Sequence, residues 1–474
     1  MLQSVATDIV WVNNYIVWQA IMWVPTLKET NQPKYILLVE AIAEAIEKGE
    51  LKVGERLPPQ RQLAWKLNLN PSTTMQAYRE AARRHLVSGE VGRGTYVLPG
   101  SKEASLFLIK NPPPLKERID LSTNLPAIDQ DNRDLASTLM ELTMSAEWGG
   151  VQSYLTPDAI QSGKIRATEW LKLRKVSYLP ENIKLCAGAQ QGLMTVLLSL
   201  CQRGESILVE ELTAPGIKAA SRQLHLPLHG IMSDEQGIIP DEFDRMIRTT
   251  GARVVILTPS LQNPTGTVMG HRRRGEVADI INKYQLIMIE DDVYGGLIKQ
   301  PPLSVLLPER TILISSFSKT VAAGLRLGYI AAPVPLLSKI DPDAQLTHWA
   351  VSSLNLMIAN RWIEDGTAEK RLNWQRREVA QRWHLARKLV GQYMLNATCP
   401  SPHVWLTAPF ETPELVQLCS QAGINVVSAD VFAVRQAPLN AIRISLTAAK
   451  NQVQLKSALE TIATLLAVQP NQKM

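Results

Sequence analysis

Apolar residues at two different spacings divide the chain into a helical N-terminal region and a long region in which strands and helices alternate. Tyr35, Leu38, Ile42 and Ala45 recur at helical spacing and predict an amphipathic helix. Further along, short β-branched runs alternate with longer helical patterns, and this alternation predicts an α/β fold with a mainly parallel, doubly wound sheet. The clearest runs are Ser206–Glu210, Arg253–Thr258, Leu286–Glu290 and Thr311–Ser315.

The same patterns predict four segments. They are an N-terminal extension over 1–33, a compact helical module over 34–98, a linker over 99–117 and one long α/β domain over 118–468. The linker contains Asn111-Pro112-Pro113-Pro114, and polyproline runs act as semi-rigid spacers. A chain of 474 residues has room for two or three domains.

The N-terminal extension is apolar from Ile9 to Val24 but is interrupted by polar residues such as Asn13 and Gln19. It lacks the basic region and cleavage site of a signal peptide, and it falls short of the about 20 apolar residues of a membrane span. We therefore expect no membrane partner. Two interpretations stay open: translation that really begins at Met22, or a helix that lies at an interface or staples a dimer.

Composition and charge narrow the class of protein only slightly. The four cysteines show no CxxC spacing, which argues against a disulfide framework or a zinc site and predicts a reducing, cytoplasmic location. The net charge of +6 is compatible with a nucleic-acid or phosphate-bearing partner and equally with an ordinary, slightly basic enzyme.

The N-terminal module has the order of a winged helix–turn–helix. A second, short helix is predicted to start within Leu57–Ala64, and Asn70 with Pro71 makes a favourable start for a third helix that runs to about Arg84. Strand-like residues over Val87–Val97 flank a tight turn. In a winged helix–turn–helix the third helix enters the major groove of DNA.

The run ERLPPQRQLAWKLNLNPSTTMQAY, followed by GRGTYV, resembles the DNA-binding domain of the GntR family of transcription regulators. The resemblance implies double-stranded operator DNA as a partner. It places these residues at the DNA: Arg61 near a phosphate or base edge, Ser72, Thr73 and Gln76 facing the groove, and Arg93 with Gly94 at the wing tip. Many relatives have a basic residue where Pro71 stands, so a base contact differs here. A solvated helix without a DNA partner is the alternative.

Polar residues gather where the predicted strands of the long domain end. Lys319 follows the strand Thr311–Ser315 directly, inside Ser316-Phe317-Ser318-Lys319, and Arg326 comes seven residues later. Two hydroxyls, an amine and a guanidinium near one strand end can bind a phosphate and form a Schiff base. The run Gly188-Ala189-Gln190-Gln191 precedes an apolar helix and offers amide donors to a phosphate.

Further polar residues follow other strands of this domain: Asn263 in Asn263-Pro264-Thr265-Gly266, Asp291 with Tyr294 three residues on, and Arg443 in Ala441–Leu446. Each one alone has an ordinary structural interpretation as a turn, a helix cap or a surface charge. Ligands of doubly wound sheets bind beyond the carboxyl ends of strands, so together these residues are the first candidates for a ligand site.

This constellation resembles the fold-type-I aminotransferases, which carry pyridoxal 5′-phosphate on a mainly parallel sheet with a smaller C-terminal α+β subdomain. The resemblance implies that Lys319 forms the internal aldimine and moves the catalytic proton. Asp291 would pair with the pyridinium nitrogen; Asp292 is the neighbouring candidate, and the spacing to Tyr294 favours Asp291.

The same resemblance implies roles for the remaining residues. Asn263 and Tyr294 would hydrogen-bond the phenolic oxygen of the ring, and Arg443 would bind a substrate carboxylate as a bidentate pair. The phosphate would be bound by Ala189 (through its backbone), Gln190, Ser316, Ser318 and Arg326. Tyr154 would reach the phosphate of the partner subunit, which implies a homodimer.

Two positions depart from the aminotransferase pattern. The family places an aromatic residue over the cofactor ring where this sequence has Ala214, and such stacking contributes on the order of 0.5–1.5 kcal/mol beyond burial. A two-residue insertion, relative to the family pattern, also follows Tyr154 ahead of Ile165-Arg166.

A GntR-type head in front of an aminotransferase-like domain is the layout of the MocR regulators. The resemblance implies a transcription regulator that senses pyridoxal phosphate, or an amino acid or amine reacting with it, through an aldimine at Lys319. The second hypothesis is a working aminotransferase that retains a DNA-binding head, because the catalytic residues are complete. The missing aromatic residue favours sensing. A third is a cofactor-storing protein without a DNA function.

Overall fold

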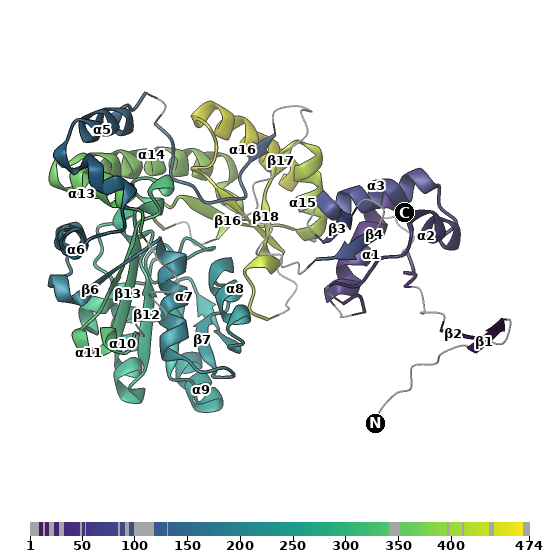
Figure 1. Ribbon diagram of the computed structural model, residues 1–474, viewed down its shortest axis with the longest axis horizontal. Helices are drawn as coiled ribbons and strands as arrows, with labels where there is room; N and C mark the ends of the chain where they lie inside the picture. Colours follow the sequence, from purple (N-terminus) through teal and green to yellow (C-terminus); the bar gives the residue numbers. More distant parts are fainter. Residues whose placement is uncertain are drawn as a thin grey trace. The chain divides into compact units, whose positions relative to one another are not determined.

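The structure is a computed structural model. It describes residues 9–12, 15–18, 23–27, 33–47, 50–52, 54–83, 86–90, 94–98, 118–129, 131–340, 351–395, 398–409, 412–435 and 440–467. The chain divides into two compact units, Met1–Ile109 and Lys110–Met474 (Figure 1). The predicted linker over 99–117 lies outside the described residues, which resume at 118, and Arg93 lies outside them too.

Three helices and a β-hairpin form the first unit, in the order that the sequence predicts. The helices are α1 (Lys34–Glu47), α2 (Gln60–Lys66) and α3 (Pro71–Arg83), and the hairpin pairs β3 (Val87–Glu90) with β4 (Gly94–Val97). Their apolar faces meet in one core, which includes Leu38, Ile42, Leu63, Ala77, Val87 and Val97.

Two polar contacts fix the third helix. The Asn70 side chain accepts from the backbone N–H of Ser72 at 2.9 Å, which satisfies a donor that the helix start would leave unpaired. The buried hydroxyl of Tyr78 donates to the carbonyl oxygen of Pro58 at 2.7 Å and ties α3 to the segment before α2. The cap and this bond together set the position of α3 within the unit.

A short antiparallel hairpin precedes these helices, formed by β1 (Ile9–Val12) and β2 (Tyr15–Trp18). The helix considered for this segment is therefore wrong. The segment is rich in β-branched and aromatic side chains, which favour extended backbone over helix. Trp23 and Leu27 are half-buried against the core of the first unit. Among the helices that the structure describes, none is both long and apolar enough to span a membrane.

A seven-stranded sheet forms the centre of the second unit, and every neighbouring pair is parallel except the two pairs that involve β14. The mainly parallel sheet is confirmed. In spatial order its strands are β6 (Ile183–Cys186), β14 (Gly328–Ala331), β13 (Thr311–Ser316), β12 (Ile287–Asp291), β11 (Val254–Leu257), β7 (Ile207–Glu210) and β8 (Leu228–Ile231).

Both faces of this sheet are buried, which explains why its strands read as unbroken apolar runs. Ile207 and Val209 of β7 join the core on one face, and Leu208 between them joins the core on the other. The first face is covered by α7 (Ala189–Leu200) and α8 (Pro215–Gln223), and the second by α9 (Pro240–Thr250) and α10 (His271–Tyr284).

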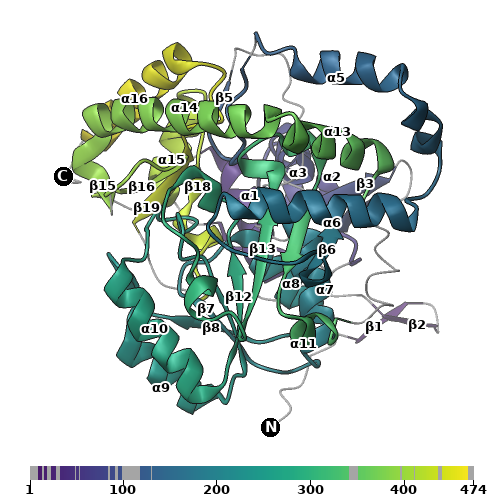
Figure 2. The same ribbon diagram turned by 90° about the vertical axis from the view of Figure 1, so that its left-hand side faces the viewer.

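A smaller α+β subdomain follows the sheet. It contains an antiparallel sheet of β15 (Met394–Leu395), β16 (His403–Thr407), β19 (Ala441–Ser445) and β18 (Val427–Ser428), with α15 (Thr412–Gln421) and α16 (Gln452–Ala467). Helix α14 (Thr367–Val390) packs beside α16 and, at its other end, beside α13 (Ser353–Glu364) (Figure 2). Strand β5 (Ile119–Asp120) pairs with β17 (Ile424–Asn425), so the first described residues after the linker join this subdomain.

Candidate functional site

The carboxyl edge of the central sheet brings together polar residues from several strands. Asp291 ends β12, and Lys319 ends the short helical turn η5 (Phe317–Lys319) that follows β13 directly. Asn263 follows β11, and Arg443, from β19 of the subdomain, reaches it: Nη1 of Arg443 donates to Oδ1 of Asn263 at 3.2 Å. Residues that are far apart in the sequence therefore line one site, as the topology of a parallel sheet requires.

The amine of Lys319 is half-buried and donates a hydrogen bond to the chain itself. Its Nζ lies 2.6 Å from the carbonyl oxygen of Asn124. Burial lowers the pKa of Lys319 to about 8, and the positive charges of Arg443 and Arg326 act in the same direction, while Asp291 opposes them. Near neutral pH this amine is therefore neutral, and nucleophilic, far more often than an exposed lysine is.

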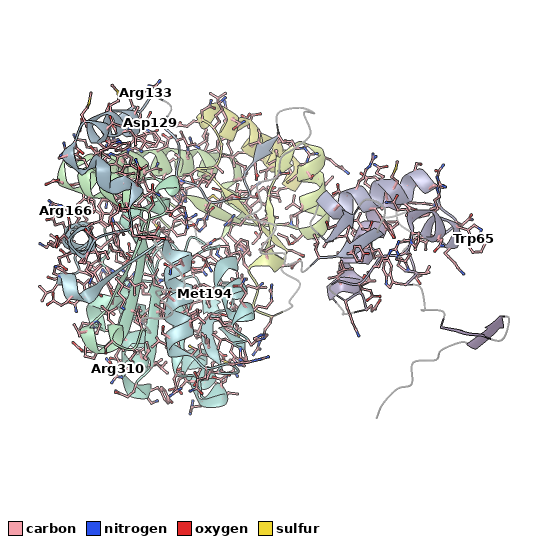
Figure 3. All side chains as sticks on the ribbon, in the orientation of Figure 1. Trp65, Asp129, Arg133, Arg166, Met194 and Arg310 are labelled. Carbon is pink, nitrogen blue, oxygen red and sulfur yellow. The ribbon has the colours of Figure 1, made fainter. Side chains whose placement is uncertain are left out.

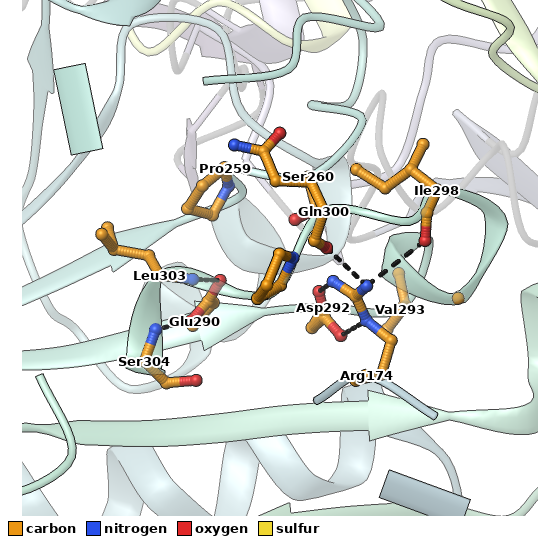
Figure 4. A network of polar contacts seen from close by, with 12 residues as sticks. Arg174, Pro259, Ser260, Glu290, Asp292, Val293, Ile298, Gln300, Leu303 and Ser304 are labelled. Carbon is orange, nitrogen blue, oxygen red and sulfur yellow. Dashed lines mark hydrogen bonds and ion pairs between the residues drawn. The ribbon is translucent and has the colours of Figure 1, made fainter. Parts of the chain in front are cut away.

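Asp291 and Asp292 have different surroundings although they are adjacent. Both oxygens of Asp292 are taken up by Arg174, with Nε to Oδ2 at 2.7 Å and Nη2 to Oδ1 at 2.8 Å (Figure 4). Asp291 accepts from the backbone N–H of Val293 at 3.2 Å, and burial raises the pKa of Asp291 to about 6. This difference supports Asp291 over Asp292 as the carboxylate that faces a ligand.

Glu290 belongs to the same buried network as Asp292. Its two oxygens accept from the backbone N–H groups of Leu303 and Ser304, each at 2.7 Å, and burial raises the pKa of Glu290 to about 7 (Figure 4). Consecutive strand residues alternate between the two faces, so Glu290 and Asp292 lie on the face opposite to Asp291. The hydrogen bonds and the ion pair of Glu290 and Asp292 fix the position of β12. The carboxylate of Asp291, on the other face, remains available to a ligand.

The start of α7, Ser318 and Arg326 form a cradle for an anion. Arg326 donates from Nη1 to Oγ of Ser318 at 3.1 Å and from Nη2 to the carbonyl oxygen of Ala187 at 3.3 Å. Gly188, at the N-cap of α7, has φ +90° and no side chain, and a Cβ there would lie 2.5 Å from Nη2 of Arg326. The bare N-terminus of α7, beginning with Ala189, thus opens toward a guanidinium, which is a favourable place for a phosphate.

Two side chains predicted to bind the phosphate have protein partners instead. Nε2 of Gln190 donates to the carbonyl oxygen of Gly216 at 2.8 Å and so ties α7 to α8. Oγ of Ser316 accepts from the N–H of Ser318 at 2.9 Å and donates to the carbonyl oxygen of Leu327 at 3.2 Å. Gln190 still has its backbone in the first turn of α7, whereas Ser316 stabilises the turn that carries Lys319.

A chain of three hydrogen bonds orients Tyr294, and no motif in the sequence marks it. Nδ2 of Asn124 donates to the hydroxyl of Tyr294 at 2.8 Å and to Nδ1 of His403 at 3.0 Å. Nε2 of His403 donates to the carbonyl oxygen of Gln262 at 2.9 Å, which leaves Nδ1 as the acceptor. Burial lowers the pKa of His403 to about 3 and raises that of Tyr294 to about 12. Tyr294 therefore accepts from Asn124 and keeps its own proton to donate into the site.

Arg443 is buried, with 3% of its surface exposed. Besides Asn263, it donates from Nη2 to the carbonyl oxygen of Ser122, and its guanidinium lies 5.1 Å from the centre of the Phe432 ring. Its Nε has no hydrogen-bond partner within the described part of the chain. Burial lowers the pKa of Arg443 to about 10. A buried guanidinium that meets only neutral acceptors is a strong site for a carboxylate.

Tyr154 and Ala214 complete the set of positions that the sequence singled out. Tyr154 lies between the turn η1 (Ala146–Gln152) and α6 (Pro157–Lys172) and is 80% exposed. Helix α6 runs without a break through the position before Ile165-Arg166 where the sequence predicts a two-residue insertion. Ala214 is the N-cap residue of α8 and packs half-buried against the core between α7 and α8.

In the first unit, one face of α3 is exposed. Ser72, Gln76 and Arg79 lie on it at spacings of four and three residues, Thr73 is half-buried at its edge, and Thr74, Ala77 and Tyr78 are buried. Arg79 was not among the predicted DNA contacts, although its spacing from Ser72 could have revealed it. Its charge makes it a candidate for a phosphate contact.

Of the other predicted DNA contacts of the first unit, Arg61 and Gly94 lie within the described residues. Arg61 is exposed on α2, four residues before Trp65, whose ring is 77% exposed and carries Nζ of Lys66 at 5.3 Å (Figure 3). Gly94 begins β4 with φ +127°, a backbone conformation that favours glycine at the tip of the wing.

Comparison with known proteins agrees with this division of the chain. Residues 116–462 match the family model "Aminotransferase class I and II", and residues 35–97 match "Bacterial regulatory proteins, gntR family". The chain belongs to the aminotransferase class I and II family. With the GntR-family head in front, it has the layout of the MocR regulators. Family membership confirms the predicted fold class and pyridoxal 5′-phosphate as the cofactor.

Relatives extend over both units. The chain is 28% identical over 461 residues to the uncharacterized HTH-type transcriptional regulator YdeF of Bacillus subtilis, covering 94% of this chain and 96% of YdeF. It is 26% identical over 415 residues to the vitamin B6 salvage pathway transcriptional repressor PtsJ of Salmonella typhimurium, covering 86% of this chain and 93% of PtsJ. The solved α-aminoadipate aminotransferase LysN of Thermus thermophilus, at 21% identity, shares the fold of the large unit with a TM-score of 0.66, over 74% of this chain and 92% of LysN.

The site of this aminotransferase-family chain fits pyridoxal 5′-phosphate. The cradle at α7 suits the phosphate, the half-buried amine of Lys319 suits the aldehyde, and Asp291 suits a protonated ring nitrogen. When bound, the cofactor supplies an aldehyde for the amine and a ring that withdraws electrons. The chain's own contribution is an amine with a lowered pKa, a carboxylate on the adjacent strand and a tyrosine hydroxyl whose proton is available.

The pKa of Lys319 predicts how cofactor uptake depends on pH. Only the neutral amine attacks an aldehyde, so the rate of uptake by the cofactor-free protein should rise with pH through about 8 and then level off. An amine with the ordinary pKa of about 10.4 would give a rate that still climbs above pH 9. Stopped-flow absorbance gives the rate, and Lys319→Ala should give no absorbance change. A rate that climbs steadily to pH 10 would contradict the lowered pKa.

The exposed face of α3 predicts a change in the salt dependence of DNA binding. If Arg79 neutralises one phosphate, Arg79→Ala should weaken binding to random-sequence duplexes and reduce the slope of log K against log salt by about 1. Gln76→Ala, on the same face but uncharged, should leave that slope unchanged, as should Arg203→Ala on the large unit. An unaltered slope in Arg79→Ala would remove Arg79 from the DNA contact. Fluorescence anisotropy at several salt concentrations measures both quantities.

Proposed function

We propose that this protein is a DNA-binding transcription regulator that senses pyridoxal 5′-phosphate, or an amino acid or amine that reacts with it, through covalent attachment at Lys319. One observation carries the proposal: the chain that presents an exposed α3 face also holds a half-buried amine of lowered pKa beside an anion cradle. The similarity to PtsJ, whose name ties it to vitamin B6 salvage, supports a signal of this chemistry. Such a regulator works in the cytoplasm, with the DNA.

Each residue of the site has a part in this proposal. Lys319 bonds to the aldehyde carbon, Asp291 holds the proton on the ring nitrogen, and Tyr294 donates to the phenolic oxygen with Asn263 beside it. The phosphate is bound by the amides of Ala189 and Gln190, the hydroxyl of Ser318 and the guanidinium of Arg326, with Ser316 supporting the turn. Arg443 binds the carboxylate of an amino-acid effector.

We further propose that the regulator is a homodimer through the surface around Tyr154. Large apolar side chains are exposed along one stretch of the large unit, on the segment before α5, on α5 (Asp134–Thr143), on the segment around η1 and on α6. They are Leu125, Ile128, Leu135, Met140, Met144, Tyr154, Ile160 and Ile165. Exposed apolar groups in such number mark an interaction surface. A second copy seated there would receive the hydroxyl of Tyr154 near its phosphate.

Aminotransferase activity is the second candidate function. The observation that favours it is that Lys319, Asp291, Tyr294, Asn263 and Arg443 are all present and gathered at one edge of the sheet. Ala214 in place of an aromatic residue favours the sensing role, because the ring then lacks one stacking partner and is held less firmly for turnover.

The deciding experiment measures DNA affinity as a function of the cofactor. A duplex selected from a random-sequence pool by the wild-type protein serves as the operator. Pyridoxal 5′-phosphate, alone or followed by each of the common amino acids, should change its affinity at least about fivefold, the lower end of usual allosteric couplings. Lys319→Ala should lose this response and keep its cofactor-free affinity, and the exposed-site control Lys299→Ala should behave as wild type. Steady release of a keto acid, together with a DNA affinity that no ligand changes, would instead support aminotransferase activity as the function.

A further inference from the structure

The segment that joins the linker to the large unit lies across two cationic groups of the cofactor site. This segment, Leu121–Ala127, is called the strap here. The carbonyl oxygen of Ser122 accepts from Nη2 of Arg443, and that of Asn124 accepts from Nζ of Lys319. Ser122 and Asn124 are 5% and 6% exposed. Two backbone carbonyls of the strap therefore accept hydrogen bonds from the amine and the guanidinium that, in the proposed function, bind the ligand.

The strap is anchored on both sides of these two carbonyls. Before them, the N–H of Leu121 donates to the carbonyl oxygen of Asn425 at 2.9 Å, which continues the pairing of β5 with β17. After them, Gln375 of α14 clamps Ala127 at both backbone groups: Nε2 donates to its carbonyl oxygen at 2.6 Å, and Oε1 accepts from its N–H at 3.1 Å. Hydrogen bonds outside the cofactor site thus stabilise the strap in this position.

Side-chain hydrogen bonds also connect the strap with its surroundings. Oγ1 of Thr447 donates to the carbonyl oxygen of Leu125 at 2.5 Å. The side chain of Asn124 reaches Tyr294 and His403, as described above, while its Oδ1 has no hydrogen-bond partner within the described part of the chain. A buried acceptor without a hydrogen bond costs free energy. The unpaired Oδ1 of Asn124 therefore makes the seated conformation of the strap less stable than a fully hydrogen-bonded one.

A ligand and the seated strap compete for the same donors. When Nζ of Lys319 forms a C=N bond with the aldehyde carbon, the aldehyde oxygen leaves as water and the nitrogen keeps at most one proton, so it no longer has the position or the protons with which it reaches the carbonyl of Asn124. A carboxylate that binds the guanidinium of Arg443 in a bidentate way needs Nη2, which now donates to the carbonyl of Ser122. The charged carboxylate forms a stronger hydrogen bond with Nη2 than the neutral carbonyl does. Occupancy of the site and full seating of the strap therefore exclude each other.

We propose that the strap converts ligand occupancy into a change at the linker: an amine-reactive or carboxylate-bearing ligand displaces the Asn124 and Ser122 carbonyls and frees the strap. The proposal rests on the proposed function. The strap begins four residues after the predicted linker ends at 117, and the linker leads without interruption to the DNA-binding head. The linker reaches the large unit through β5, which the strap continues, so release of the strap removes the support of β5 on that side and thereby changes the freedom of the head.

Competition and simple support predict opposite signs for a loosened strap. If the seated strap competes with the ligand, a variant that weakens its seating binds the ligand more tightly, because less has to be displaced. If the strap only completes the wall of the pocket, the same variant binds the ligand equally or less tightly. The sign of the change therefore separates the two roles.

Gln375→Met and Thr447→Val provide the test, since both residues hold the strap and neither belongs to the cofactor site. The probe is pyridoxal 5′-phosphate, titrated by absorbance into the cofactor-free, full-length protein. Each variant should bind it about fivefold more tightly, the factor that corresponds to one net hydrogen bond. Gln381→Met, at an exposed position of the same helix, is the matched control and should titrate as wild type.

Hydrogen–deuterium exchange of residues 118–129 supplies the second measurement. In the wild-type protein, addition of pyridoxal 5′-phosphate should speed exchange in this segment, and in the two variants exchange should already be fast without it. Weaker or unchanged cofactor affinity in both variants would overturn the proposal that the ligand displaces the strap. So would a wild-type protein that takes up the cofactor but shows no change of exchange in this segment. A wild-type protein that takes up no cofactor would overturn the proposed function itself, and the two failures are thus distinguishable.

Discussion

The large unit depends on a concentration of positive charge at one edge of its sheet. Lys319, Arg326 and Arg443 act on each other there, and two of them are largely withdrawn from water. An unpaired buried charge costs several kcal/mol. The chain offsets this cost chiefly with neutral acceptors; among the described residues, the charge of Asp291 acts on Lys319 and that of Asp120 acts on Arg443. The offset is incomplete, as the lowered pKa values of Lys319 and Arg443 show, and the edge therefore favours an anionic ligand.

The rest of the unit follows from keeping this edge in place. The ion pair of Arg174 with Asp292 and the backbone bonds of Glu290 fix β12 from the opposite face, so that Asp291 is held toward Lys319. The helix terminus at Ala189 adds partial positive charge for a phosphate. The same need for acceptors explains why the strap is drawn onto the site: its carbonyls are the nearest neutral partners for two cations. A sensor results when the ligand supplies better acceptors than the strap does.

Much of this arrangement could be predicted from the sequence, because periodicity and position along a strand survive in the folded state. The bounds of α3 and the strands β11, β12 and β13 agree with the predicted runs within about two residues, and Asp291, Lys319 and Asn263 do meet at one edge. Asn124 and His403 could not be found in this way. They act through hydrogen bonds between distant segments, and no spacing marks them. The same reason explains Gln190 and Ser316, whose side chains found protein partners, and the N-terminal hairpin, whose apolar run is compatible with either a helix or strands.

The central claim is that one chain couples cofactor chemistry at Lys319 to DNA binding, and thermodynamic linkage tests it most directly. A coupling between two ligands is reciprocal, so DNA must change the affinity for the cofactor by the factor by which the cofactor changes the affinity for DNA. The measurement is an absorbance titration of the cofactor-free protein with pyridoxal 5′-phosphate, with and without a saturating amount of the selected duplex. The account predicts two curves displaced by that same factor, and two superimposable curves would contradict it.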